Sequence, residues 1–265
     1  MDHGHSTQHP PRTPAPADLP DAAAVRRDGA ETAHAAESNR LLRALDHADY
    51  EWLLPQLTPA RLRLKQVLVE PDAPIAHVHF VRDGVCSIIA TEQEGGDVEV
   101  GTVGCEGFVG LPLLFEDDAM PNRVIVQVEG DAWRLPADAF RRALDARPAV
   151  RTLCLRYAAY FTSQLSQSVA CNRLHTLEER AARWLLMTHD RVHGSAFEMT
   201  HGFLSLMLGV RRAGVTVAMG ALQNAGLIRY ARGRVEVLDR AGLEEASCGC
   251  YAITRAAQDR LLGAG

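Results

Sequence analysis

The hydrophobic period of this chain changes twice, after a short helical lead-in from Asn39 to Leu57 and again near Pro136, and these changes limit the folds open to it. From Leu62 to Leu135, turn signals rich in Gly, Pro and Asp separate short β-rich runs. The runs are Val67 to Val69, His77 to Val81, Val85 to Thr91, Val98 to Val103 and Val124 to Val128. Such spacing is typical of a small antiparallel jelly roll. After Pro136 apolar residues recur every three or four positions, which predicts helices and an α+β fold class.

The longest helical segment, residues 148–174, has a narrow apolar seam. Pro148 suits the first turn of this helix, where its missing N–H costs nothing. The spacing of the seam is of coiled-coil type and favours a dimerisation helix. Packing of the same face against the predicted sheet is the alternative. The seam residues are Val150, Cys154, Tyr157, Phe161 and Leu165.

Residues 199–238 have the pattern of a winged helix-turn-helix. Thr200 is a good N-cap, Ser205 is small where two helices would cross, and Gly209 tolerates the positive φ of the turn between them. The second helix runs from Arg211 to Ala225. Two short strands around an Ala-Arg-Gly turn at residues 231–233 then form the wing.

Charge along the chain supports DNA binding by this segment. The whole chain has a formal net charge of -5, but residues 200–240 contain six arginines and two acidic residues, a local charge of +4. In a docked recognition helix, Arg212 would donate two hydrogen bonds to a guanine edge and Val217 would touch a thymine methyl. The expected DNA-binding residues are Thr200, His201, Arg211, Arg212, Gly214, Thr216, Val217, Arg229, Arg232 and Arg234.

With these motifs the chain resembles the Crp/Fnr family of bacterial regulators from about residue 39 to residue 240. The stretches that carry the resemblance are residues 80–85, residues 107–115, and residues 199–212 with Val215 and Thr216. The resemblance implies a cyclic-nucleotide-binding-like jelly roll, a dimerisation helix and a winged helix-turn-helix. It also implies a homodimer on two half-sites on the order of 34 Å apart, and RNA polymerase as a further partner.

The departures from that family affect the expected effector and operator. Leu111 stands where cyclic-AMP-binding members have a ribose-binding Glu, and Arg123 is followed by Val124 rather than Ser. An effector pocket that includes Gly110, Leu111 and Arg123 is therefore not expected to bind cyclic AMP. No cysteine precedes Cys86, which argues against the iron–sulfur cluster of oxygen-sensing members. Ala213 and Val217 replace two of the family's base-reading residues, so a different operator is expected.

The predicted organisation is a disordered tail at 1–36, a sensor domain at 37–147, a dimerisation helix at 148–174, a DNA-binding domain at 175–245 and a C-terminal tail at 246–265. The chain has neither an apolar signal-like segment near its start nor an apolar stretch long enough to span a membrane, and its six cysteines are scattered. We therefore expect a cytoplasmic protein without a membrane partner.

Three alternatives compete with an effector-sensing regulator. His77, His79 and Asp83 loosely match a cupin metal motif and would suit an enzyme, whereas a regulator of this kind is expected to have no catalytic or metal site. The cysteines, with Cys248 and Cys250 in the predicted tail, suggest a redox sensor, although two thiols supply only half of a metal site. The jelly roll is otherwise a dimer scaffold without effector.

Overall fold

The computed structural model describes residues 1, 37–91 and 96–263 of the 265-residue chain. The predicted tail at 1–36 lies, apart from Met1, outside the described residues. The helices are α2 (Arg40–Arg43), α3 (His47–Leu53), η1 (Leu54–Gln56), η2 (Leu111–Phe115), α4 (Ala137–Ala146), α5 (Pro148–Leu174), α6 (Leu177–His189), α7 (His201–Leu208), α8 (Arg212–Asn224), α9 (Arg240–Ala246) and α10 (Cys250–Leu262). The strands are β1 (Thr58–Leu62), β2 (Val67–Val69), β3 (His77–Val81), β4 (Val85–Thr91), β5 (Asp97–Val103), β6 (Phe108–Val109), β7 (Arg123–Val128), β8 (Gly130–Pro136), β9 (Ala196–Glu198), β10 (Ile228–Ala231) and β11 (Arg234–Val237).

Two antiparallel four-stranded sheets, with strand orders β1-β8-β3-β6 and β2-β7-β4-β5, form the predicted jelly roll. Phe80, Phe108 and Phe140 lie in its core with ring centroids 5.4 to 6.4 Å apart. The sequence pattern does not predict β1 and β8, because Pro59 and Gly130 interrupt the β-rich composition. Pro59 is tolerated since β1 is an edge strand, where a missing N–H breaks no ladder.

Helix α5 has the predicted bounds, but its apolar seam faces the jelly roll of the same protomer. Tyr157 is 1% exposed, and its ring centroid lies 5.1 Å from that of Phe108. Val150, Cys154 and Phe161 are buried in the same core, and Leu165 packs against it. Packing against the sheet, the alternative left open by the sequence, is what the structure shows. This corrects the assignment of these five residues to a dimer interface, because a second copy cannot reach them.

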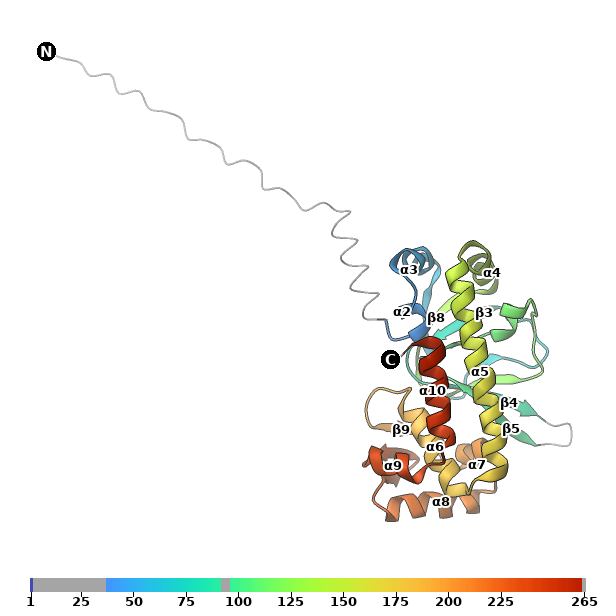
Figure 1. The fold of residues 1–265 in the computed structure, drawn as a ribbon, viewed down its shortest axis with the longest axis vertical. Helices are drawn as coiled ribbons and strands as arrows, with labels where there is room; N and C mark the ends of the chain where they lie inside the picture. The colour runs from blue at the N-terminus through green and yellow to red at the C-terminus, as the bar shows by residue number, and fades with distance from the viewer. Residues whose placement is uncertain (2–36, 92–95, 264–265) are drawn as a thin grey trace.

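The C-terminal segment is a helix, which corrects the predicted tail at 246–265. Helix α10 lies along α5, and the two run side by side in Figure 1. It begins at Cys250, beside the end of α5. At its other end Leu262 joins the jelly-roll core, and Arg40 donates from Nη2 to the Gly263 carbonyl at 2.5 Å. Helix α10 therefore connects the helix-turn-helix domain to the jelly roll.

A buried junction joins the two domains, and we define it by Glu99, Thr102, Glu106, Trp184 and Arg191. Arg191, just after α6, makes a bidentate ion pair with Glu106 at 3.0 and 2.6 Å and donates to Thr102 Oγ1 at 2.7 Å. Trp184 Nε1 donates to Glu99 Oε1 at 3.2 Å, and burial raises the pKa of Glu99 to about 7. In each of these contacts, one residue belongs to the jelly-roll domain and the other to the helix-turn-helix domain. The junction therefore fixes one orientation between the two domains.

Among the described residues, no single helix is long and apolar enough to cross a bilayer. Only α7 and α8 taken together reach that length and composition, and a bend of 102° separates them.

Candidate nucleic-acid interface and ligand cavity

Helices α7 and α8 meet at the turn that the sequence predicts. Gly209 has φ 62°, a left-handed conformation that L side chains rarely adopt, and the two helices diverge by 102°. Thr200 caps α7 by accepting a hydrogen bond from the Phe203 N–H at 3.2 Å. The shared core is well buried, with Leu204, Leu208, Val215 and Ala218 each no more than 4% exposed. This confirms the predicted core positions, with Val210 only half-buried.

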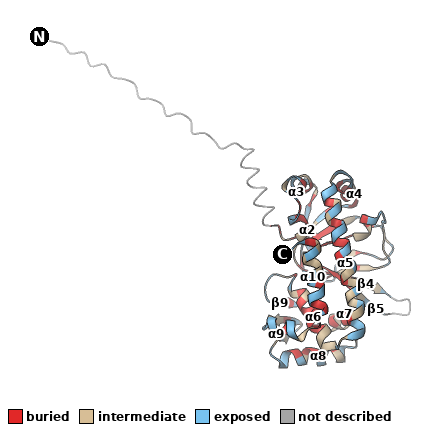
Figure 2. Cartoon of the chain, viewed as in Figure 1, coloured by how far each residue is buried: buried red, intermediate tan, exposed pale blue. Residues whose placement is uncertain are grey.

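The leading end of α8 presents a row of exposed side chains. Arg211, Arg212, Thr216 and Val217 are all exposed, and Val217 retains 66% of its surface. Figure 2 shows exposed residues along α8 at the lower end of the molecule. Gly214 was expected in this row, but it is half-buried and faces Leu177 of α6. A Cβ there would lie 3.1 Å from that leucine, so Gly214 serves close helix packing and is not an exposed contact.

His201, at the start of α7, contacts both the wing and α8. Its ring stacks on Tyr230 of the wing with centroids 4.6 Å apart, and its Nδ1 lies 3.2 Å from Thr216 Oγ1 on α8. The Tyr230 N–H also donates to Gln223 Oε1 at 2.7 Å, near the end of α8. These contacts hold α7, α8 and the wing in one arrangement, which the sequence pattern does not reveal.

The wing is the antiparallel hairpin β10–β11, with Arg232 (φ 51°) and Gly233 (φ 76°) in its turn. Strand β9, which the sequence pattern does not predict, pairs with β11 and anchors the wing to the domain. Arg229 differs from the other wing arginines, because its Nη1 lies 2.6 Å from Glu236 Oε2 across the hairpin. Its charge is already paired, which weakens the expectation that it binds a phosphate.

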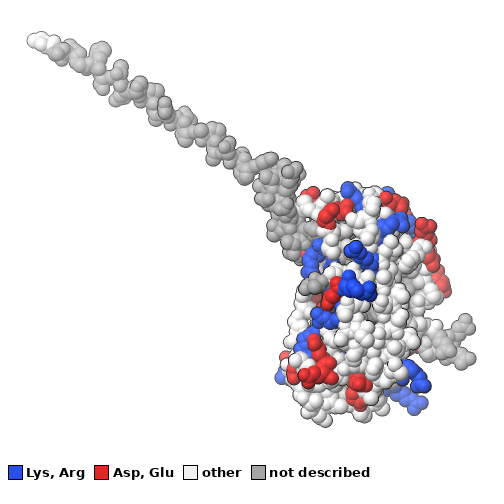
Figure 3. All heavy atoms as spheres, in the orientation of Figure 1, with Lys and Arg blue, Asp and Glu red and all other residues white. Residues whose placement is uncertain are grey.

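Four of the expected arginines carry unpaired charge on this surface. Within the described part of the chain, Arg211, Arg212, Arg232 and Arg234 make no salt bridge. The sixth arginine of the basic segment, Arg240, is instead tied to Asp190 at 2.7 Å and to the Tyr251 hydroxyl. In Figure 3, acidic side chains gather over α9, while basic side chains project from the opposite side of the same end. The four unpaired arginines therefore come from the leading end of α8 and from the wing.

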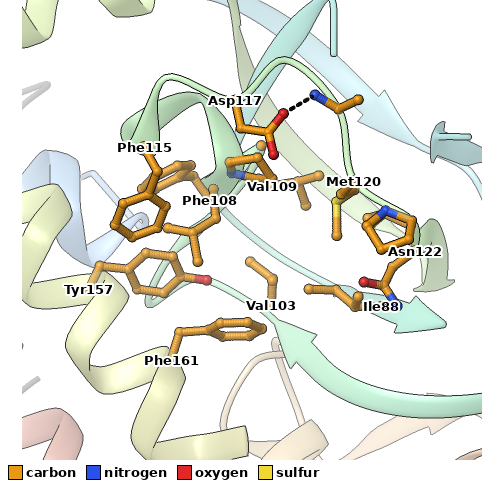
Figure 4. Close-up of a pocket in the computed structure, with 16 residues that line it drawn as sticks. Ile88, Val103, Phe108, Val109, Phe115, Asp117, Met120, Asn122, Tyr157 and Phe161 are labelled. Atoms are coloured by element: carbon orange, nitrogen blue, oxygen red, sulfur yellow. Dashed lines mark hydrogen bonds between the residues drawn. The ribbon is translucent and has the colours of Figure 1, made fainter. Parts of the chain in front are cut away.

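A cavity of about 310 Å³ lies between the jelly roll and α5. Figure 4 shows Phe108, Tyr157, Phe161 and Val103 on one side, with Asp117 and Asn122 on the other. Predicted pocket residues Gly110 and Leu111 line it, and Gly110 has φ 108° at the start of η2. Arg123 does not line it. That arginine points to Glu70, with 3.8 Å between Nε and Oε2, which corrects its place in the predicted pocket.

The lining of this cavity is apolar, and its one charged residue is acidic. Asp117 accepts a hydrogen bond from the Ala119 N–H at 3.2 Å, and no Lys, Arg or His is among the described lining residues. A cyclic phosphate is an anion that needs cationic or N–H partners when it leaves water. The geometry therefore favours an uncharged, apolar ligand here.

The other chemical motifs do not form a site where the sequence suggested one. Burial lowers the pKa of His79 to about 4, and the Asp83 carboxylate accepts from the His193 N–H instead of meeting the histidines. Burial raises the pKa of Cys86 and Cys154 to about 12, so neither is a reactive thiolate. Both cysteines are buried residues of the hydrophobic core.

Comparison with known proteins finds two family models on this chain. The model of the cyclic nucleotide-binding domain matches residues 59–147, and that of the Crp-like helix-turn-helix domain matches residues 179–246. No curated protein matches the chain.

Solved structures share the fold at low sequence identity. FixK2 from Bradyrhizobium japonicum is 15% identical with a TM-score of 0.62, over 72% of this chain and 98% of that chain. A crp/fnr-family transcriptional regulator from Eubacterium rectale is 17% identical with a TM-score of 0.59, over 81% and 97%. A CRP-family transcriptional regulator from Thermus thermophilus is 20% identical with a TM-score of 0.59, over 71% and 96%.

Proposed function

Because this chain belongs to the Crp/Fnr family of transcriptional regulators, we propose that it recognises a specific duplex sequence as a homodimer and responds to an apolar ligand in its jelly roll. The observation that carries the proposal is the set of unpaired arginines on α8 and the wing. A contact with RNA polymerase stays a prediction, since no described surface is specific to it.

The two groups of arginines have different tasks in this proposal. Arg212 lies at the leading end of the recognition helix, where side chains reach base edges in the major groove. Arg232 and Arg234 lie on the wing, where basic side chains contact phosphates and fix the register. Val217 supplies an apolar contact suited to a thymine methyl.

Selection of bound fragments from random duplex DNA tests this assignment. We expect a palindromic motif whose half-sites are on the order of 34 Å, or one helical turn, apart. Arg142→Ala is a matched control, because Arg142 is exposed on α4 at the other end of the molecule. Selection of no motif, or equal loss of binding in Arg142→Ala and Arg212→Ala, would contradict the proposal.

The proposed dimer uses the exposed face of α5 in place of the buried seam. Five exposed residues follow one another on this face at steps of four and three positions: Leu155, Ala159, Thr162, Ser166 and Val169. Leu155 is 47% and Val169 73% exposed, which is high for apolar side chains on a helix. This is the spacing of a coiled-coil contact, and its small residues allow a close approach of two helices.

Replacing Ala159 or Val169 with Glu should yield monomers, because the carboxylates of the two copies would meet where the two α5 helices contact each other. Sedimentation velocity measures the change, and circular dichroism checks that the helices persist. Ile253→Glu is the control, because Ile253 is a 55% exposed apolar residue on a different helix, α10. A dimer that survives both α5 changes would rule out this face.

The ligand proposal is tested with an uncharged fluorescent probe, N-phenyl-1-naphthylamine. We expect saturable binding that cyclic AMP does not displace. Val103→Trp should abolish binding by filling the cavity, while Val67→Trp, on an exposed β2 position, should not. Saturable binding of cyclic AMP, or equal probe binding by the Val103 variant, would contradict an apolar site.

A further inference from the structure

Four side chains with metal-binding atoms converge where α5 ends and α10 begins. Cys171 lies in the last turn of α5, and His175 is the residue that follows the end of this helix. Cys248 and Cys250 come from the turn between α9 and α10. The three Sγ atoms and a ring nitrogen of His175 all lie within 4.8 Å of one another. Residues more than 70 positions apart thus form one compact set, which we call the Cys3His cluster.

The distances within the Cys3His cluster suit a tetrahedral ion. The Cys171 and Cys248 Sγ atoms are 3.5 Å apart, and the Cys250 Sγ lies 3.5 Å from His175 Nδ1. With Zn–S bonds of about 2.3 Å and Zn–N bonds of about 2.0 to 2.1 Å, a tetrahedron separates two sulfurs by about 3.8 Å and a sulfur from a nitrogen by about 3.6 Å. Small side-chain shifts bring both pairs to these values.

The surroundings favour thiolates at this place. The three cysteines are at most 4% exposed and form a buried cluster of their own. Gln167 donates from Nε2 to the Cys250 Sγ at 3.0 Å, and Cys250 opens α10, where the helix dipole favours negative charge. The Arg183 side chain lines the same small pocket as Cys171 and places a cation beside the cluster. Arg183 is itself buried, with no partner for its Nε among the described residues.

We propose that Cys171, His175, Cys248 and Cys250 bind one zinc ion that fastens the start of α10 to the end of α5. Three thiolates and one imidazole complete a closed four-coordinate site, the kind that stabilises structure and leaves no position for a substrate. Each thiol releases its proton to solvent when it binds. The ion carries two positive charges, so the bound site has a net charge of -1, and Arg183 lies close enough to offset it.

The two other uses of this cluster fit the geometry less well. An iron–sulfur cluster places several iron and sulfide atoms between its thiolates and needs wider separations than a single ion. A disulfide between Cys171 and Cys248 would use two of the four groups and leave Cys250 and His175 without a role. The proposal does not depend on DNA binding, so the two can fail separately.

Metal analysis of the full-length protein, purified under reducing conditions from zinc-supplemented medium, is the first test. We expect one zinc per chain after dialysis against a chelating resin. Cys248→Ser and His175→Ala should lose the ion, while Cys154→Ser, a buried cysteine on the same helix, should retain it. Zinc-free wild-type protein, or iron with inorganic sulfide, would overturn the proposal.

A second measurement uses only the wild-type chain, in case the variants do not fold. Thiol alkylation followed by mass spectrometry should find Cys171, Cys248 and Cys250 protected until a chelator removes zinc, with the half-buried Cys105 unchanged by the chelator. Cobalt in place of zinc should give thiolate-to-metal charge-transfer bands and the intense visible bands of a tetrahedral ion. Alkylation that is independent of the chelator, or octahedral cobalt spectra, would equally refute a Cys3His zinc site.

Discussion

The ion pair of Arg191 and Glu106 offers a direct test of what holds the two domains together. The side chains are 5% and 1% exposed, so Arg191→Met leaves a carboxylate buried without its cation. That carboxylate retains the Gly104 N–H as a donor at 3.2 Å but loses both bonds from the guanidinium. Removal of one partner of a buried pair typically costs about 3 to 5 kcal/mol of unfolding free energy.

An independent route leads to a similar magnitude. The variant loses the two hydrogen bonds from the guanidinium to Glu106, and hydrogen bonds to charged groups contribute about 1.5 to 3 kcal/mol each, or about 3 to 6 kcal/mol together. Lost hydrogen bonding to Thr102 adds to the deficit.

Urea unfolding followed by tryptophan fluorescence measures the effect, because Trp184 lies at the junction. The double variant Arg191→Met with Glu106→Leu is the matched control. Replacing both charges with apolar groups is often neutral or stabilising, by up to about 4 kcal/mol, so this variant should recover most of the loss. A loss below about 1 kcal/mol in the single variant, or no recovery in the double variant, would refute the reasoning.

Three further predictions concern separate parts of the molecule. Gly209→Ala should lower the free energy of unfolding by about 1 to 2 kcal/mol, because Gly209 has a left-handed φ. Gly220→Ala, where a Cβ in α8 meets open space, should raise it by up to about 1 kcal/mol. Changes of the same sign in urea unfolding would contradict this pair of expectations. The fold favours neutral Glu99, so its contribution to stability is full below the unfolded pKa of about 4.3 and is lost as pH rises through about 7. Glu99→Gln should flatten that decline, and parallel pH profiles of unfolding would argue against it. Arg212→Ala should weaken DNA binding by about 1 to 3 kcal/mol at one base position. Arg232→Ala should lower the salt dependence of DNA binding by about one charge in filter-binding titrations. An unchanged slope of log affinity against log salt concentration would remove the wing from the interface.

Local pattern was sufficient to predict the helix-turn-helix. Its turn glycine, its N-cap Thr200 and its apolar spacing act within a few residues of one another, and the structure confirms them. Five strands of the jelly roll follow for the same reason. The capping box of Thr176 and Glu179 at the start of α6 is also a local feature, because its two residues are three positions apart.

Contacts between distant segments were beyond the sequence pattern. A helical seam indicates that one face is buried but not what covers it, which is why the face of α5 with Tyr157 was assigned to a partner rather than to the jelly roll. The pairing of Arg229 with Glu236 depends on the register of a hairpin. Cys171 and Cys248 are 77 positions apart, so only the docking of α10 on α5 brings them together.

The course of α10 also bears on the order in which the chain completes its fold. During synthesis the jelly roll and the helix-turn-helix are both translated before α10. The hydrogen bond from Arg40 to Gly263 spans 223 positions, among the slowest kinds of contact to form because loop closure precedes any gain. Until then, the surface of α5 that α10 covers stays open to chaperones and proteases. The nascent protein thus gains the second connection between its domains, in addition to the Arg191–Glu106 junction, only after translation of its last helix.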